Sequence, residues 1–322
     1  MIGGVRLGVA VLVGWAGAWL WAYGIAVLQP LCEPGSPFWE LAENNSYWAR
    51  DVRWAAVLAV SAVLAAVSRR SWLIAVAVPW LAADIVLDRI DPGRPALLPA
   101  TLIAGVAVTA VAIPAALRPP GRPLALWIPL ACLFTASTIV ALESPSDAEP
   151  QLALSRLAAY VVCAIATVVC VLASLTPSAL QRRWPAVAGL AVGVTLFGLP
   201  LPPLVTFGLM VLGAATVVLL REPWGGVRRA AGVVALHAAG LVAVGFVLLF
   251  SLLQAGRPFT ALAGNEAVNT ADSDPSLLIW SVAVAVAWAV LVRLSKAIAA
   301  TPAAAPASGP GQGARAGSAP PR

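Results

Sequence analysis

The chain has 322 residues, of which 61% are hydrophobic and only 11% are charged. The surface of a soluble protein of this length needs more charge, so the composition excludes a soluble globular fold and predicts an all-α, polytopic bundle of transmembrane helices. The formal net charge of +6 would suit nucleic-acid binding, but it comes from arginines between apolar runs, and no nucleic-acid partner is expected.

Apolar runs separated by Gly, Pro and charged residues predict about ten spans. The segment 186–220 is short for two crossings, so eight spans plus a re-entrant hairpin there is the alternative. The ten predicted spans are 5–28, 52–68, 72–90, 97–117, 124–142, 157–175, 186–199, 204–220, 230–253 and 277–294.

The arginines predict the orientation. With the N-terminus in the cytoplasm, fourteen basic residues fall on the inner side and six on the outer side or at outer helix ends. Both termini are therefore expected inside. Residues 1–296 are predicted to form one integral membrane domain and 297–322, rich in Ala, Gly and Pro, a disordered cytoplasmic tail. The dominance of Arg, Ala, Gly and Pro suggests a bacterial protein of the plasma (inner) membrane.

Two outer loops are predicted to be long, Gln29 to Asp51 and Gln254 to Ser276. The inner loops are short, which leaves no room for a cytosolic domain. Pro79 removes a backbone donor from the span 72–90 and predicts a kink there.

Three aspartates stand in or next to the span 72–90. Asp84 lies about 18 Å along that helix, while Asp88 and Asp91 approach its outer end. Offsets of four and seven residues place all three within about 60° of one helix face. An acid inside the membrane is costly and favours a functional role, so the three form a candidate ion, proton or substrate site.

The neighbouring span 52–68 offers one partner for these acids. If the two spans are antiparallel about residue 70, Arg53 lies level with residue 87, next to Asp88, which predicts a structural ion pair between Arg53 and Asp88. The same reflection places Ala56 and Val57 beside Asp84, so Asp84 is expected to lack a polar partner on this span.

The remaining candidates are weaker. His237, the single histidine, lies in the span 230–253, where a proton relay is the alternative to a packing role. Cys163 and Cys170 share a helix face and are expected to act as small apolar residues. No catalytic, metal-binding or cofactor-binding motif occurs, and no cofactor is expected.

Three functional hypotheses follow. The first is a transporter-like protein for a small solute or cation, which uses the aspartates. The second is a non-catalytic membrane partner or assembly subunit, whose partners besides the lipid bilayer are other membrane proteins. The third is a lipid-processing enzyme at the outer face, although the sequence favours a protein that is not an enzyme.

Overall fold

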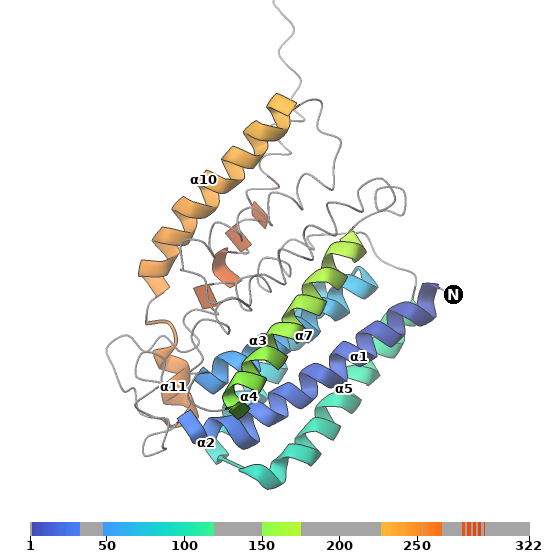
Figure 1. Ribbon diagram of the computed structural model, residues 1–322, viewed down its shortest axis with the longest axis vertical. Helices are drawn as coiled ribbons and strands as arrows, with labels where there is room; N and C mark the ends of the chain where they lie inside the picture. Colours follow the sequence, from blue (N-terminus) through green and yellow to red (C-terminus); the bar gives the residue numbers. More distant parts are fainter. Residues whose placement is uncertain are drawn as a thin grey trace, which may run out of the picture.

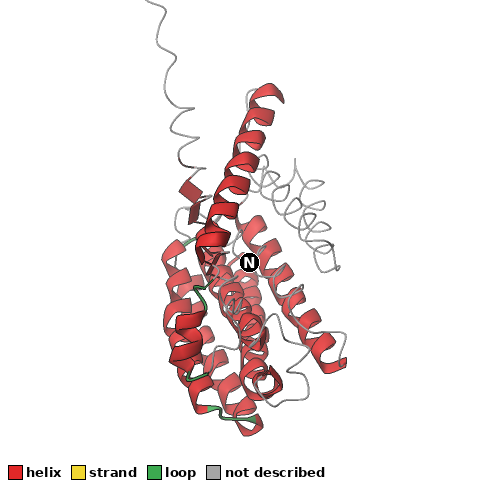
Figure 2. Cartoon of the chain, turned by 90° about the vertical axis from the view of Figure 1, so that its left-hand side faces the viewer, coloured by secondary structure: helices red, strands yellow, loops and turns green. Residues whose placement is uncertain are grey.

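The computed structural model describes residues 2–32, 48–118, 150–174, 227–252 and 254–265, with isolated positions between 279 and 293. Every regular element in these ranges is a helix, as Figure 2 shows. The prediction of an all-helical fold is confirmed for this part of the chain. Three of the predicted spans (124–142, 186–199 and 204–220) and the tail 297–322 lie outside the described residues.

Four described helices are long and apolar enough to cross a membrane: Gly4–Leu31, Trp48–Ser68, Arg94–Leu117 and Ala153–Cys170. A fifth candidate consists of Val242–Leu252 and Arg257–Ala263, which are bent by 44° at the break between them. By length and composition these are the helices of a membrane protein. The total of ten spans stays a prediction.

The first span is longer than predicted and is irregular near its end. α1 (Ile2–Tyr23) continues into a π-helical turn, η1 (Gly24–Leu28), and then into α2 (Gln29–Cys32). A π-turn adds a residue to one turn of helix and is frequent at functional sites. The chain stays helical after this turn, so the helix extends beyond the predicted span 5–28 and includes Gln29.

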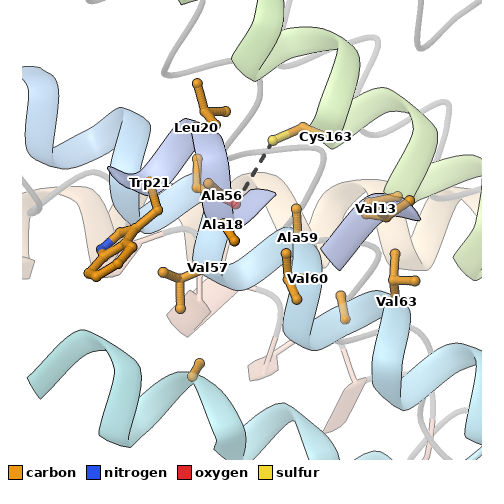
Figure 3. Packing of buried hydrophobic residues seen from close by; sticks show 14 of the residues in the cluster. Val13, Ala18, Leu20, Trp21, Ala56, Val57, Ala59, Val60, Val63 and Cys163 are labelled. Carbon is orange, nitrogen blue, oxygen red and sulfur yellow. Dashed lines mark hydrogen bonds between the residues drawn. The ribbon is translucent and has the colours of Figure 1, made fainter. Parts of the chain in front are cut away.

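α3 (Trp48–Ser68) is the centre of the bundle, since 94% of its most apolar window is buried. It begins four residues before the predicted span 52–68, so Arg50 belongs to the helix and not to an outer loop. Its inner positions are mostly Ala and Val, and Figure 3 shows them packed against α1 residues such as Val13 and Leu20.

α7 (Pro150–Ser174) packs along α3. Cys163 points its thiol at the carbonyl oxygen of Ala55, 4.0 Å away, which is the dashed line in Figure 3. One heptad on, Cys170 points at the carbonyl of Ala62, 3.7 Å away. Small residues at such contacts let helix backbones approach closely. Both cysteines are fully buried.

α1 and α5 (Leu97–Leu117) run side by side (Figure 1). The indole N–H of Trp15 donates to the hydroxyl of Thr109 at 3.1 Å. Gly105 lies directly under the Trp15 ring, so a β-carbon there would collide with it. Only 22% of the apolar window of α5 is buried, so α5 lies at the edge of the described bundle.

The predicted span 72–90 consists of two kinds of helix. Residues Ser71–Val76 form a 3₁₀-helix, η3, and Ala77–Ile90 form α4. Pro79 is the third residue of α4, where its missing N–H costs no intrahelical bond. The kink predicted at Pro79 is thus replaced by a change of helix type just before it. At about 2.0 Å and 1.5 Å per residue, η3 and α4 together are about 33 Å long.

The second predicted outer loop, 254–276, contains a helix that the sequence analysis missed. After α10 (Val227–Leu252), the chain turns and forms α11 (Arg257–Ala263). Gly264 ends α11 in the left-handed region at φ 85°, which glycine adopts without strain. Thr260 and Ala263 are buried, and α11 contacts α4.

Candidate functional site

Four charged side chains meet inside the bundle and are called the charge cluster below: Arg50 and Arg53 of α3, and Asp84 and Asp88 of α4. Each is at most 2% exposed. A spacing of three residues on α3 and of four on α4 puts each pair on one helix face. The cluster contains two cations and two anions and is therefore neutral as a unit.

Asp84 is surrounded by N–H donors. Its Oδ1 accepts hydrogen bonds from the indole of Trp21 and from Nε of Arg53, each at 2.7 Å. Its Oδ2 accepts from the indole of Trp54 at 2.8 Å and from Nη2 of Arg53 at 3.3 Å. These four bonds come from α1 and α3 and fix the position of the carboxyl group on α4.

The two carboxyl oxygens of Asp88 differ in their contacts. Its Oδ2 lies 2.8 Å from Nη2 of Arg50 and 3.0 Å from Nη2 of Arg53. It also accepts a hydrogen bond from Nε of Arg50 at 2.9 Å. The other oxygen, Oδ1, is buried, and no donor within the described ranges reaches it. Asp88 is the less constrained of the two acids.

Other helices complete the site. Gln29 of α2 accepts a hydrogen bond from Nη1 of Arg53 through Oε1. Thr260 of α11 accepts one from Nη1 of Arg50 at 3.0 Å. Gly24 of η1 lies so close to Cγ of Arg53 that a β-carbon at this glycine would collide with it. Three elements, α2, α4 and α11, therefore bind the two guanidinium groups of α3.

The structure places Arg53 against Asp88, as the residue spacing suggested, but Arg53 also bridges to Asp84. The expectation that Asp84 lacks a polar partner on α3 is wrong, because both Arg53 and Trp54 bind it. The reason is the 3₁₀-helix η3. Its larger rise places Asp84 about 24 Å beyond Arg70 instead of 21 Å, which shifts its neighbours on α3 from residue 56 to residue 54.

The third aspartate is separate from the other two. Asp91 is exposed and follows the last residue of α4, in the left-handed region at φ 46°. The three acids do not share one face, because the helix ends at Ile90. His237 lies in α10, and its side chain is outside the described part of the structure.

The sequence analysis missed five members of the site: Trp21, Gln29, Arg50, Trp54 and Thr260. Arg50, Arg53 and Trp54 share one helix face, and this spacing was visible once α3 was known to begin at Trp48. Nothing in the sequence connected α1, α2 or α11 to the charge cluster, because their contacts are separated by up to 210 positions in the chain.

The arrangement favours ion pairing over metal binding. Asp84 and Asp88 direct their oxygens at guanidinium groups, and no group of three His, Cys, Asp or Glu side chains that could hold a metal ion occurs among the described residues. In a low-dielectric interior these pairs are strong, and removing one partner leaves a buried charge uncompensated.

Comparison with known proteins gives no relative. No family model, no curated protein and no solved structure matches this chain.

Proposed function

We propose that this chain is a transport protein for a cation or a small solute, and that the charge cluster is the element that changes state during its cycle. The observation that carries the proposal is the burial of two arginines, which belong to the candidate span Trp48–Ser68, against two aspartates of the neighbouring helix α4.

The energetic cost of this arrangement supports a functional role. Transfer of an ionised side chain from water into a protein interior costs several kcal/mol even after relaxation. A buried ion pair often contributes no more stability than apolar residues of similar volume. A chain that otherwise fills its core with Ala, Val and Leu could have filled this space in the same way. Intramembrane charges commonly belong to ion or substrate pathways.

The helices around the charge cluster are interrupted, which also supports transport. The π-turn η1 precedes Gln29, and the 3₁₀-helix η3 precedes α4. A bend of 44° separates the end of α10 from α11, which carries Thr260. Discontinuous helices recur at the binding sites of transporters, and local breaks supply the hinges of conformational changes.

The test is ion flux in reconstituted vesicles. Purified protein is placed in liposomes, a gradient of H⁺, Na⁺ or K⁺ is imposed, and a dye selective for that ion reports its flux. We expect flux of at least one of these ions above that of empty vesicles. The paired variant Arg53→Met/Asp84→Asn removes one cation and one anion together, so it should keep the fold and reduce the flux at least about tenfold.

The matched control is Asp91→Asn, which removes an exposed carboxylate just beyond the same helix. Its flux should equal that of the unmodified protein. A folded paired variant with full flux would show that transport does not use the charge cluster, and wild-type protein without flux of any of the three ions would remove cation transport from consideration.

One observation favours a second candidate, a non-catalytic membrane subunit. Asp84 accepts four hydrogen bonds from three residues, an arrangement that also suits a permanent structural acid. In that case the protein should purify in a fixed ratio with another membrane protein after mild solubilisation. The paired variant should then retain this partner.

A further inference from the structure

A cavity of about 480 Å³ lies between α1, η3, α4, α5 and the short helix η4 (Arg94–Ala96). Only apolar side chains and the rings of Trp21 and Trp80 line it, with Ala83 and Leu87 on α4 and Ile103 and Val111 among the lining residues of α5. The lining offers no hydrogen-bonding side chain apart from the two indoles. It therefore suits a hydrocarbon ligand and not a polar one.

The cavity is elongated along the helices. Its lining on the α5 side extends from Ala96 to Val111, about 22 Å at 1.5 Å per residue. One leaflet contributes about half of the ~30 Å hydrocarbon core of a bilayer, so a whole acyl chain can lie in this space. α5 also exposes Leu98, Ile103 and Val106, as expected for a helix that faces lipid.

A cation stands near one end of the cavity. Arg94 is exposed and lies two residues before Ala96, a lining residue, in the short helix η4 (Arg94–Ala96). A guanidinium group at the end of an apolar groove complements the phosphate of a lipid whose chain occupies the groove.

The cavity is linked to the charge cluster through one side chain. The Trp21 ring lines the cavity, while its indole N–H donates to Asp84 at 2.7 Å. Trp80 packs edge-on against Trp21, with 5.6 Å between the ring centroids. A chain in the cavity would contact the ring that fixes Asp84 and would restrain its position.

We infer that this cavity binds an acyl chain of an anionic membrane phospholipid, with the lipid phosphate near Arg94. The inference does not depend on the transport proposal, because it concerns binding of a bilayer component and is tested without any flux measurement.

The experiment uses vesicles that contain the whole protein and phosphatidylglycerol with a photoreactive group at the end of one acyl chain. After illumination, mass spectrometry locates the cross-links. We expect them to concentrate on the lining residues of α4 and α5. Phosphatidylcholine with the same reactive chain should give at least about threefold fewer cross-links there, and Arg94→Gln should remove this preference.

Two pairs of variants separate binding in the cavity from ordinary lipid contact. Ala83→Trp on α4 and Ala107→Trp on α5 fill the cavity, whereas Ala82→Trp and Ala110→Trp add the same ring at exposed neighbours outside it. Each filling variant that retains the thermal stability of its control should lose cross-linking at the lining residues at least about fivefold. The two controls should not.

Cross-links spread evenly over the exposed faces of α5, or unchanged by both filling variants, would overturn the inference, because they would reflect only the surrounding lipid. Cross-links from α4 and α5 to a second copy of the chain in place of lipid would overturn it as well.

Discussion

At the scale of single residues, the donors around Asp84 determine what a substitution there should do. Two indoles and one guanidinium group direct N–H bonds at its two oxygens. An asparagine keeps one acceptor but turns an NH₂ group toward some of these donors. It also leaves Arg53 with one carboxylate fewer. Replacement of the acid alone is therefore expected to destabilise the protein and is a poor test of function.

Arg53 is the residue whose loss should cost the most stability, because it bridges both acids and also bonds Gln29. Arg53→Met should lower the free energy of unfolding by about 3–5 kcal/mol, since it leaves the buried Asp84 carboxylate without its cation, while Asp88 keeps Arg50. Adding Asp84→Asn should recover part of this loss, and thermal unfolding in detergent of the two single variants and the double variant measures the coupling. Strictly additive effects would contradict a coupled pair.

Gly24 provides a second prediction at this scale. A β-carbon there meets Cγ of Arg53, and the ion pairs prevent that side chain from moving aside. Gly24→Ala should destabilise the protein by about 1–3 kcal/mol. Gly8→Ala on the same span adds the same methyl group where nothing lies within 4 Å, so it should be neutral or slightly stabilising. Equal unfolding temperatures for the two variants would contradict the close approach of η1 to Arg53.

At the scale of elements, the pairing of α3 with α4 shows what sequence periodicity can and cannot provide. Reflection about residue 70 correctly brought Arg53 to Asp88, because an error of two residues still falls within reach of a long arginine side chain. The same reflection gave the wrong neighbours for Asp84, because its partners Arg53 and Trp54 are found only when α3 and α4 are aligned to the correct residue. The six residues of η3 look like any apolar helix start, and nothing in SWLIAV marks them as 3₁₀ instead of α.

α11 contacts the site through two neighbouring side chains, Phe259 and Thr260. Thr260 accepts a hydrogen bond from Arg50, and the Phe259 ring packs edge-on against Trp54 at 5.3 Å. Thr260→Val keeps the shape but removes this acceptor from Arg50, at a cost of about 1–3 kcal/mol. Backbone amides of 257–263 should then exchange with deuterium faster than in Thr260→Ser, which keeps the hydroxyl. Equal exchange in the two variants would mean that packing alone holds α11.

At the scale of the whole molecule, composition was enough to predict a helical membrane protein, since apolar helices of span length need no knowledge of their contacts. The site was predictable only in part. The position of Asp84 within an apolar run was read from the sequence, but Trp21 bonds Asp84 and Thr260 bonds Arg50 from distant elements. Which helices pack together depends on small residues such as Gly17 and Ala55, and these are common throughout the chain.

The orientation of the bundle is tested by the two ends of the η3–α4 segment. Ser71 begins η3 next to Arg69 and Arg70, and Arg94 lies beyond the far end of α4; both Ser71 and Arg94 are exposed. In a chain whose four native cysteines are replaced, a membrane-impermeant thiol reagent should label Arg94→Cys in intact cells. Ser71→Cys should react only after the cells are made permeable.

Any other labelling pattern of these two cysteine variants would contradict part of the predicted topology. The reverse pattern would place the N-terminus outside and contradict the arginine rule for this chain. Labelling of both positions in intact cells would show that η3 and α4 do not cross the membrane, even though their combined length of about 33 Å is sufficient. The charge cluster would then lie outside the hydrocarbon core. Its burial would be a matter of protein packing alone, and the energetic argument for transport would lose its basis.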